Sequence, residues 1–186
     1  MTRRPVTART GGHVVVESLR ALGAEVAFGV PGIHSLAIWE ALRTSPIRAY
    51  GARTECSAGF AADGYARSCG RAAPLLLSTG PGALNSLTAL MEAASSHVPV
   101  VALSSQVPRE LLGRGRGYLH ELSDQLASFA PIVKHAARVE SSDAIADLLV
   151  QAWTTTEAAM AKLEEIEEGT SDIQRLIISR GLVSVS

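Results

Sequence analysis

Two features of this sequence combine residue types and spacing that chemistry can use. Glu55 is a single carboxylate just ahead of a helical stretch that is rich in alanine and glycine. It either belongs to a site or simply favours the first turn of that helix, where an acid is stabilising. The glycine-rich turn Thr79-Gly80-Pro81-Gly82 follows a short apolar run, and its glycines permit unusual backbone angles and the close approach of a ligand. Asn85, just behind this turn, can cap the next helix or contact a ligand.

Histidines and arginines offer further polar groups. His34 follows a Val-Pro-Gly turn, and His120 and Glu121 lie just after the glycine- and arginine-rich loop Gly113–Gly117. No cluster of His, Cys, Asp or Glu has metal-ligand spacing, so we expect no metal site among these residues. The arginines of this region could hold an anionic substrate or a flavin phosphate, although exposed loop charges are usually solvated. They are Arg109, Arg114 and Arg116.

Composition excludes several classes of partner. The chain has 186 residues, of which 47% are hydrophobic, and this suffices for one sizeable core. A net charge of -1 gives no bulk attraction to nucleic acid or to an anionic membrane. No apolar run reaches the roughly 18 residues that a membrane span needs. The spacing of Cys56 and Cys69 suits neither a disulfide framework nor zinc, so we expect free thiols and a cytoplasmic protein.

Short apolar strands alternate with helices along the chain. This alternation predicts an α/β fold, a doubly wound and mostly parallel sheet with helices on both faces. The predicted strands are 25–30, 47–51, 74–78 and 99–104, with a possible edge strand at 132–139. The predicted helices are 12–22, 35–42, 58–67, 83–94, 118–129 and 142–153.

The same pattern predicts where a ligand would bind. In doubly wound sheets, ligands occupy the edge formed by the carboxyl ends of the strands. Pro31-Gly32, Glu55, Gly80-Pro81-Gly82 and Gln106 each come just after a predicted strand. We therefore expect these residues to line one edge of the sheet.

Several ordered motifs resemble a known family. They are Gly29-Val30-Pro31-Gly32, then Thr54-Glu55 followed by Ala62-Asp63-Gly64-Tyr65-Ala66-Arg67, and then Ser78-Thr79-Gly80-Pro81-Gly82-Ala83-Leu84-Asn85. Together they resemble the N-terminal pyrimidine-binding domain of thiamine diphosphate enzymes, in the acetolactate synthase-like group. The run Gly113–Gln125 is similar to a narrower set, the 2-oxo acid decarboxylases that act on guanidino-oxopentanoate.

The resemblance implies a role for Glu55. In this family the corresponding acid bonds the pyrimidine ring nitrogen of the cofactor and favours the imino tautomer, which then removes the thiazolium C2 proton. Such a carboxyl should be shielded from water and protonated, because burial disfavours the charged form. The cofactor-binding residues implied are Pro31, Gly32, Glu55, Thr79, Gly80, Pro81, Gly82 and Asn85.

The resemblance also implies partners and substrate. The family holds the diphosphate through magnesium in a C-terminal domain, whose motif does not occur in this sequence, so we expect a homodimer or a separate chain with that domain. The substrate would be a small 2-oxo acid, with His34, His120 and Glu121 as substrate-facing residues. A flavin is compatible with the arginine run, and no motif specifies one.

The end of the chain differs in kind. We expect a flexible N-terminus at 1–10, the pyrimidine-binding domain at 11–156, shortened at its end, and a helical tail of different origin at 157–186, with helices at 157–168 and 173–180. The run 168–178 resembles the end of an acyl-CoA dehydrogenase, in which Glu168 would match a catalytic base. Nothing else of that family is present, so we give Glu168 no catalytic role.

Three functional hypotheses remain open from the sequence. The chain could supply half of the active site of a carboligase or decarboxylase, or be a non-catalytic interaction module that pairs with a full-length relative. It could also be a non-functional product of a truncated or chimeric gene. Whether the chain is an enzyme is therefore undecided by sequence.

Overall fold

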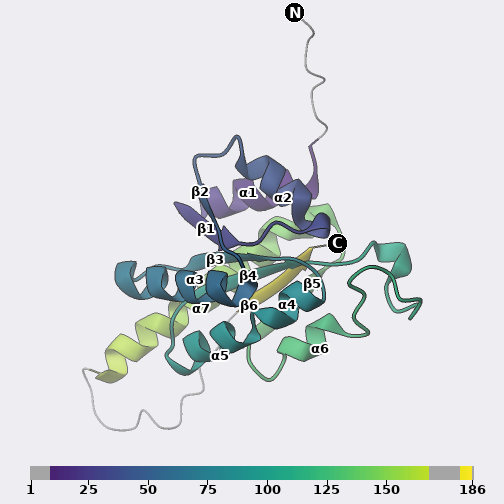
Figure 1. The fold of residues 1–186 in the computed structure, drawn as a ribbon. Helices are drawn as coiled ribbons and strands as arrows, with labels where there is room; N and C mark the ends of the chain where they lie inside the picture. The colour runs from purple at the N-terminus through teal and green to yellow at the C-terminus, as the bar shows by residue number, and fades with distance from the viewer. Residues whose placement is uncertain (1–8, 168–180, 186) are drawn as a thin grey trace, which may run out of the picture.

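The computed structural model of the chain describes residues 9–167 and 181–185, with side chains for 9–158 (Figure 1). Its strands are β1 (Val26–Gly29), β2 (Arg48–Gly51), β3 (Ala73–Leu77), β4 (Val100–Ser105), β5 (His135–Val139) and β6 (Gly181–Val185). Its α-helices are α1 (Gly11–Ala21), α2 (Leu36–Leu42), α3 (Glu55–Cys69), α4 (Pro81–Asn85), α5 (Leu87–Ser95), α6 (Gln125–Phe129) and α7 (Ile145–Glu167). Three short 3₁₀ helices are η1 (Ile33–Ser35), η2 (Arg109–Leu111) and η3 (Ser142–Ala144).

The six described strands form one parallel sheet in the order β2-β1-β3-β4-β6-β5. Strands β3 and β4 are buried along their whole length, as strands covered on both faces must be. Their register pairs Leu75 with Ala102 and Leu76 with Leu103. Successive residues of a strand point to opposite faces of the sheet. Because both faces of β3 and β4 carry buried residues, each face needs its own layer of helices.

Two hydrophobic clusters fill the space between the sheet and its helices. One lies under α1, α2 and α7 and includes Leu19, Leu42 and Leu149. The other lies under α3, α5 and α6 and includes Ala62 and Phe129. The two groups of helices cover opposite faces of the sheet, which confirms the doubly wound α/β fold (Figure 1).

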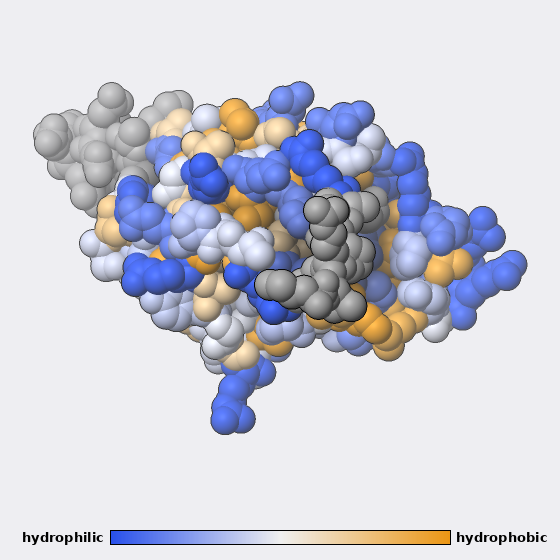
Figure 2. Space-filling view, turned by 90° about the horizontal axis from the view of Figure 1, so that it is seen from above, coloured by the Kyte–Doolittle hydropathy of each residue, from blue (hydrophilic) through white to orange (hydrophobic). Residues whose placement is uncertain are grey.

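The face that carries α1 and α2 is mostly hydrophilic, and hydrophobic residues gather there only in small separate patches (Figure 2). This matches two amphipathic helices whose apolar sides are turned to the sheet. Among the described residues, no helix is long and apolar enough to span a membrane.

Two predicted helices differ from the structure. Residues 118–129 were expected to form one helix, but only Gln125–Phe129 is helical, because His120 has a φ of 63° and Asp124 caps a new start by accepting from the Ala127 N–H. The predicted helix 83–94 is divided into α4 and α5. The break falls at Ser86, whose hydroxyl donates to the carbonyl oxygen of Ala83 at 2.7 Å.

The tail also differs from the prediction. Helix α7 runs from Ile145 to Glu167 without a break at the predicted boundary after residue 156. The prediction of a wholly helical tail is wrong at its end, because Gly181–Val185 forms strand β6 between β4 and β5. Leucine and valine have the propensity for this role, and β6 continues the parallel pairing of β4. The predicted helix at 173–180 lies outside the described residues.

Candidate cofactor-binding site

The topological switch point of the sheet lies between β1 and β3. From β1 the chain moves outward to β2, and from β3 it moves the other way to β4, so two connections diverge from the carboxyl ends of β1 and β3. They lie very close there, since a Cβ on Gly32 would come within 2.1 Å of Ser78 Oγ. Only glycine fits this position. The exposed Pro31 precedes it, so both predicted residues lie at the edge where ligands bind.

Glu55 is the first residue of α3 and lies half-buried at this edge. Helix α3 begins here because Thr54 caps it, its hydroxyl accepting from the Ser57 N–H at 3.2 Å. Asn85, at the end of α4, donates its side-chain N–H to Glu55 Oε2 at 3.1 Å. The sequence left open whether Asn85 caps a helix or serves a site. In the structure its amide orients the carboxylate of Glu55.

Gly82 lies against the other oxygen of the same carboxylate. A Cβ on Gly82 would be 2.7 Å from Glu55 Oε1, closer than carbon and oxygen normally approach. Pro81 occupies the first position of α4, where its missing N–H costs no hydrogen bond. The predicted turn therefore starts α4 at Pro81 and places the backbone of Gly82, which has no side chain, against the carboxylate of Glu55.

Thr79 and Gly80 anchor the turn to its neighbours. The buried hydroxyl of Thr79 shares a hydrogen bond of 3.0 Å with Ser105 Oγ at the end of β4. Gly80 has a φ of 55°, which favours glycine, and its N–H donates to Gln125 Oε1 at 2.7 Å. A Cβ on Gly80 would meet the carbonyl oxygen of His120 at 2.2 Å. The loop after β4 therefore packs directly on this turn.

The two predicted substrate-facing histidines lie together. The ring centroids of His34, in η1, and His120, in the loop, are 6.0 Å apart, and the Tyr118 ring is 6.1 Å from that of His34. Burial, and then the proximity of His120, lower the pKa of His34 below its ordinary value. The Nδ1 atoms of both histidines are buried and have no hydrogen-bond partner within residues 9–158. The surroundings of His34 therefore favour its uncharged imidazole beside the turn.

Glu121 holds the loop itself. Its two carboxylate oxygens accept from the N–H groups of Gly115 and Tyr118, each at 2.9 Å. The bond from Tyr118 contributes most to lowering the pKa of Glu121. Both oxygens accept hydrogen bonds from the loop, so this arrangement favours a role in holding the loop conformation over a contact with substrate. A substrate role for Glu121 stays a prediction.

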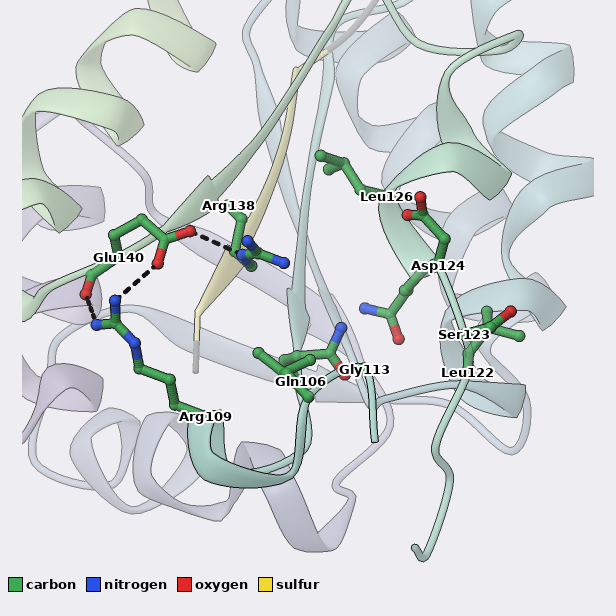
Figure 3. Close-up of a pocket in the computed structure, with 11 residues that line it drawn as sticks. Gln106, Arg109, Gly113, Leu122, Ser123, Asp124, Leu126, Arg138 and Glu140 are labelled. Carbon is green, nitrogen blue, oxygen red and sulfur yellow. Dashed lines mark hydrogen bonds and ion pairs between the residues drawn. The ribbon is translucent and has the colours of Figure 1, made fainter. Parts of the chain in front are cut away.

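Of the predicted anion-binding arginines, Arg109 forms an ion pair, whereas Arg114 and Arg116 are exposed on the loop. Arg109 and Arg138 share the carboxylate of Glu140, at 3.1 and 2.8 Å, beside a pocket of about 410 Å³ that Gln125 also lines. Figure 3 shows these side chains around the pocket. The bond from Arg138 is the main cause that lowers the pKa of Glu140. Within the described residues, no group of three His, Cys, Asp or Glu side chains could hold a metal ion.

The residue that the sequence analysis missed is Gln125. It is 2% exposed and links the glycine-rich turn to the end of β4. A glutamine inside a stretch predicted to be helical gives no sign of this role. Only the Ser123-Asp124 pair before it, a possible helix cap, indicated that the chain turns here.

Comparisons with known proteins show the family of the chain. Residues 9–128 match the model of the family described as thiamine pyrophosphate enzyme, N-terminal TPP binding domain. The chain is 38% identical over 150 residues to a probable 2-ketoarginine decarboxylase of Pseudomonas aeruginosa, covering 81% of this chain and 27% of that protein. It is 36% identical over 155 residues to an acetolactate synthase of Arthrospira platensis, covering 81% and 26%. A probable acetolactate synthase large subunit of Methanocaldococcus jannaschii is 32% identical over 171 residues, covering 89% and 28%.

The fold and the switch-point edge define an α/β domain of the kind that binds a ligand at the carboxyl ends of its strands. The chain belongs to the thiamine diphosphate enzyme family, and it corresponds to the N-terminal, pyrimidine-binding domain of acetolactate synthase-like members. It spans about a quarter of the length of the curated relatives it matches.

Proposed function

We propose that this chain supplies the pyrimidine half of a thiamine diphosphate site in a 2-oxo acid carboligase or decarboxylase. The observation that carries the proposal is the carboxylate of Glu55, held between the Asn85 amide and the bare backbone of Gly82 at the switch point. A pyrimidine ring requires a carboxyl group at one edge and room to approach the backbone. The described residues fit both requirements.

Each residue then has a distinct task. Glu55 bonds a ring nitrogen of the pyrimidine, and Asn85 keeps the carboxyl aimed at it. Gly32 and Gly82 leave space that a side chain would fill. Ser78 Oγ is buried without a hydrogen-bond partner among the described residues, so it is a further candidate contact. The bound cofactor supplies the electron sink for breaking the bond beside a 2-oxo group.

The second half of the site would come from another domain or chain. Magnesium and the diphosphate would be held there, which makes a homodimer or a separate partner chain part of the proposal. Exposed apolar side chains on three helices in mutual contact support such a partner. They are Phe60 on α3, Leu84 on α4 and Met91 on α5.

For the substrate we propose a small 2-oxo acid. His34 and His120 lie beside the turn that carries the cofactor-binding residues, and imidazole nitrogens can form hydrogen bonds with a polar substrate. Two of the relatives are named as acetolactate synthases and one as a 2-ketoarginine decarboxylase. The names of these relatives have in common an activity on 2-oxo acids.

Calorimetric titration tests the proposal. Thiamine diphosphate with Mg²⁺ should bind the wild-type chain, alone or with a partner chain that has the diphosphate-binding domain. Glu55→Gln should weaken this binding, and in the complete enzyme it should nearly abolish exchange of the cofactor C2 proton. Unchanged exchange in that variant would contradict the role of Glu55.

The exposed apolar residues Phe60 and Met91 also favour a second candidate, a non-catalytic module that pairs with a full-length relative. Partner binding without cofactor binding would support it. A chain that binds neither would be a non-functional product.

A further inference from the structure

Gln125 uses every hydrogen-bonding group of its side-chain amide inside the protein. Its Oε1 accepts from the Gly80 N–H at 2.7 Å. Its Nε2 donates to Ser104 Oγ at 3.0 Å and to the carbonyl oxygen of Ser105 at 3.1 Å. One acceptor and two donors at this reach are available only from a carboxamide on a long side chain.

These bonds join three segments that are distant in sequence. Gly80 belongs to the turn after β3, and Ser104 and Ser105 end β4. Gln125 itself begins α6, at the end of the loop that carries His120. The loop also touches the turn at a second point, where the carbonyl oxygen of His120 occupies the space that a Cβ on Gly80 would need.

The strands do not depend on Gln125 for their pairing. Residues of β3 and β4 pair along the ladder from Ala73 to Leu77, and Thr79 bonds directly to Ser105 beyond it. What Gln125 adds is a link between the turn and the loop. A side chain that only stabilised the sheet would not need an acceptor aimed at the Gly80 N–H.

We propose that Gln125 is a positioning residue that holds the Gly80 turn and the His120 segment together as one unit. The inference rests on the proposed function, in which the turn faces the cofactor and His120 faces the substrate. Gln125 touches neither of them and acts through Gly80 and the loop. Its loss should therefore disturb the cofactor side and the histidine side together.

The direct test is amide hydrogen exchange at Gly80 in the wild-type chain and in Gln125→Met. Methionine has a similar length and removes all three bonds. Protection of the Gly80 N–H should fall about tenfold, as the loss of one buried hydrogen bond allows. The pKa of His34 should also rise toward its ordinary value, because a loosened loop leaves His34 less buried and no longer holds His120 nearby.

The matched control is Thr156→Val, which removes a different buried polar group, a hydroxyl whose hydrogen bond stays within its own helix. Both variants should lower the melting temperature, but only Gln125→Met should change Gly80 exchange and the His34 titration. An equal effect of both variants on these two readouts would overturn the proposal.

Two further measurements cover the case in which Gln125→Met fails to fold. In the wild-type chain the Gly80 N–H must exchange slowly, and fast exchange would overturn the inference without any variant. Gln125→Glu keeps the acceptor for Gly80 but, when ionised, cannot donate to Ser105. Because this bond keeps the turn joined to the loop, the Gly80 N–H should stay protected in Gln125→Glu, and loss of that protection would contradict the proposal.

Neither readout needs the cofactor, so the inference and the proposed function can fail separately. If thiamine diphosphate binds, its Kd should rise in Gln125→Met and stay unchanged in Thr156→Val. If it does not bind the wild-type chain, the proposed function fails, while Gly80 exchange still decides whether Gln125 joins the turn and the loop.

Discussion

Gly82→Ala should weaken cofactor binding while it changes the stability of the fold little. The new Cβ would lie 2.7 Å from Glu55 Oε1, whereas ordinary contact begins at 3.4 Å, so the carboxylate must move by about 0.7 Å. The hydrogen bond from Asn85 is already 3.1 Å long, and such a shift takes it out of range. The carboxylate then loses both its orientation and its place at the turn.

The magnitude follows from the bond that the displaced carboxylate would no longer make. A hydrogen bond contributes about 0.5–1.5 kcal/mol, so the Kd for thiamine diphosphate should rise about two- to tenfold. Stability should change little. Alanine gains about 0.5–1 kcal/mol over glycine in a helix, and the 3.0 Å contact of the new Cβ with Ser78 Cβ offsets part of this gain.

Gly64→Ala is the matched control. It also adds a methyl group to a helix, but nothing lies within 4 Å of the new Cβ. Calorimetry should show a raised Kd for Gly82→Ala only, and urea denaturation should show both variants folded. Equal Kd values in the two variants would refute the inference that Gly82 leaves the space that the Glu55 carboxylate needs.

Three further predictions concern stability and the loop. Arg67→Met should lower the free energy of unfolding by about 1–3 kcal/mol in urea, because it leaves the buried Asp63 carboxylate without its 2.7 Å partner; an unchanged midpoint would contradict this. Because the pKa of His34 is lowered by folding, the unfolded chain binds the proton more readily, so stability should fall as pH drops below about 6.5, and His34→Gln should flatten that slope in denaturation at several pH values. Glu121→Gln should speed tryptic cleavage at Arg116, since glutamine has one acceptor oxygen in place of the two that bind the loop N–H groups; equal cleavage rates would show that the loop does not depend on this carboxylate.

The sequence predicted the central part of the fold because local pattern and tertiary role agree there. Strands β3 and β4 are continuous apolar runs, and a sheet covered on both faces requires that pattern. The glycine-rich turn after β3 was predictable for the same reason, since its glycines are needed for close approach. The edge residues Gly32 and Glu55 were predicted from their positions just after predicted strands and from the motifs that contain them.

What the sequence did not predict depends on contacts between distant segments. The loop that carries His120 has apolar residues at helical spacing, but a positive φ at His120 and the cap at Asp124 delay the helix to Gln125. The partners of Gln125 are 45 and 21 residues away, at Gly80 and Ser104. No local propensity encodes such a network.

Strand β6 was missed for a related reason. Its sequence, Gly181–Val185, is short, and the helical spacing of apolar residues predicted for 173–180 dominates the local sequence pattern. Its position becomes clear only from the register, in which it pairs with both β4 and β5. A strand added between two others depends on partners far away in the sequence, which periodicity does not reveal.

The central claim is that the edge around Glu55 binds a pyrimidine, and amide chemical shifts measured during a titration with thiamine test it most directly. Thiamine carries the pyrimidine without the diphosphate, so it tests the pyrimidine contacts without the need for a diphosphate-binding domain. We predict shifts at Gly32, Glu55, Gly82 and Asn85 in the wild-type chain that are reduced in Glu55→Gln. Shifts confined to the pocket around Arg138, or no shifts at all, would contradict the account.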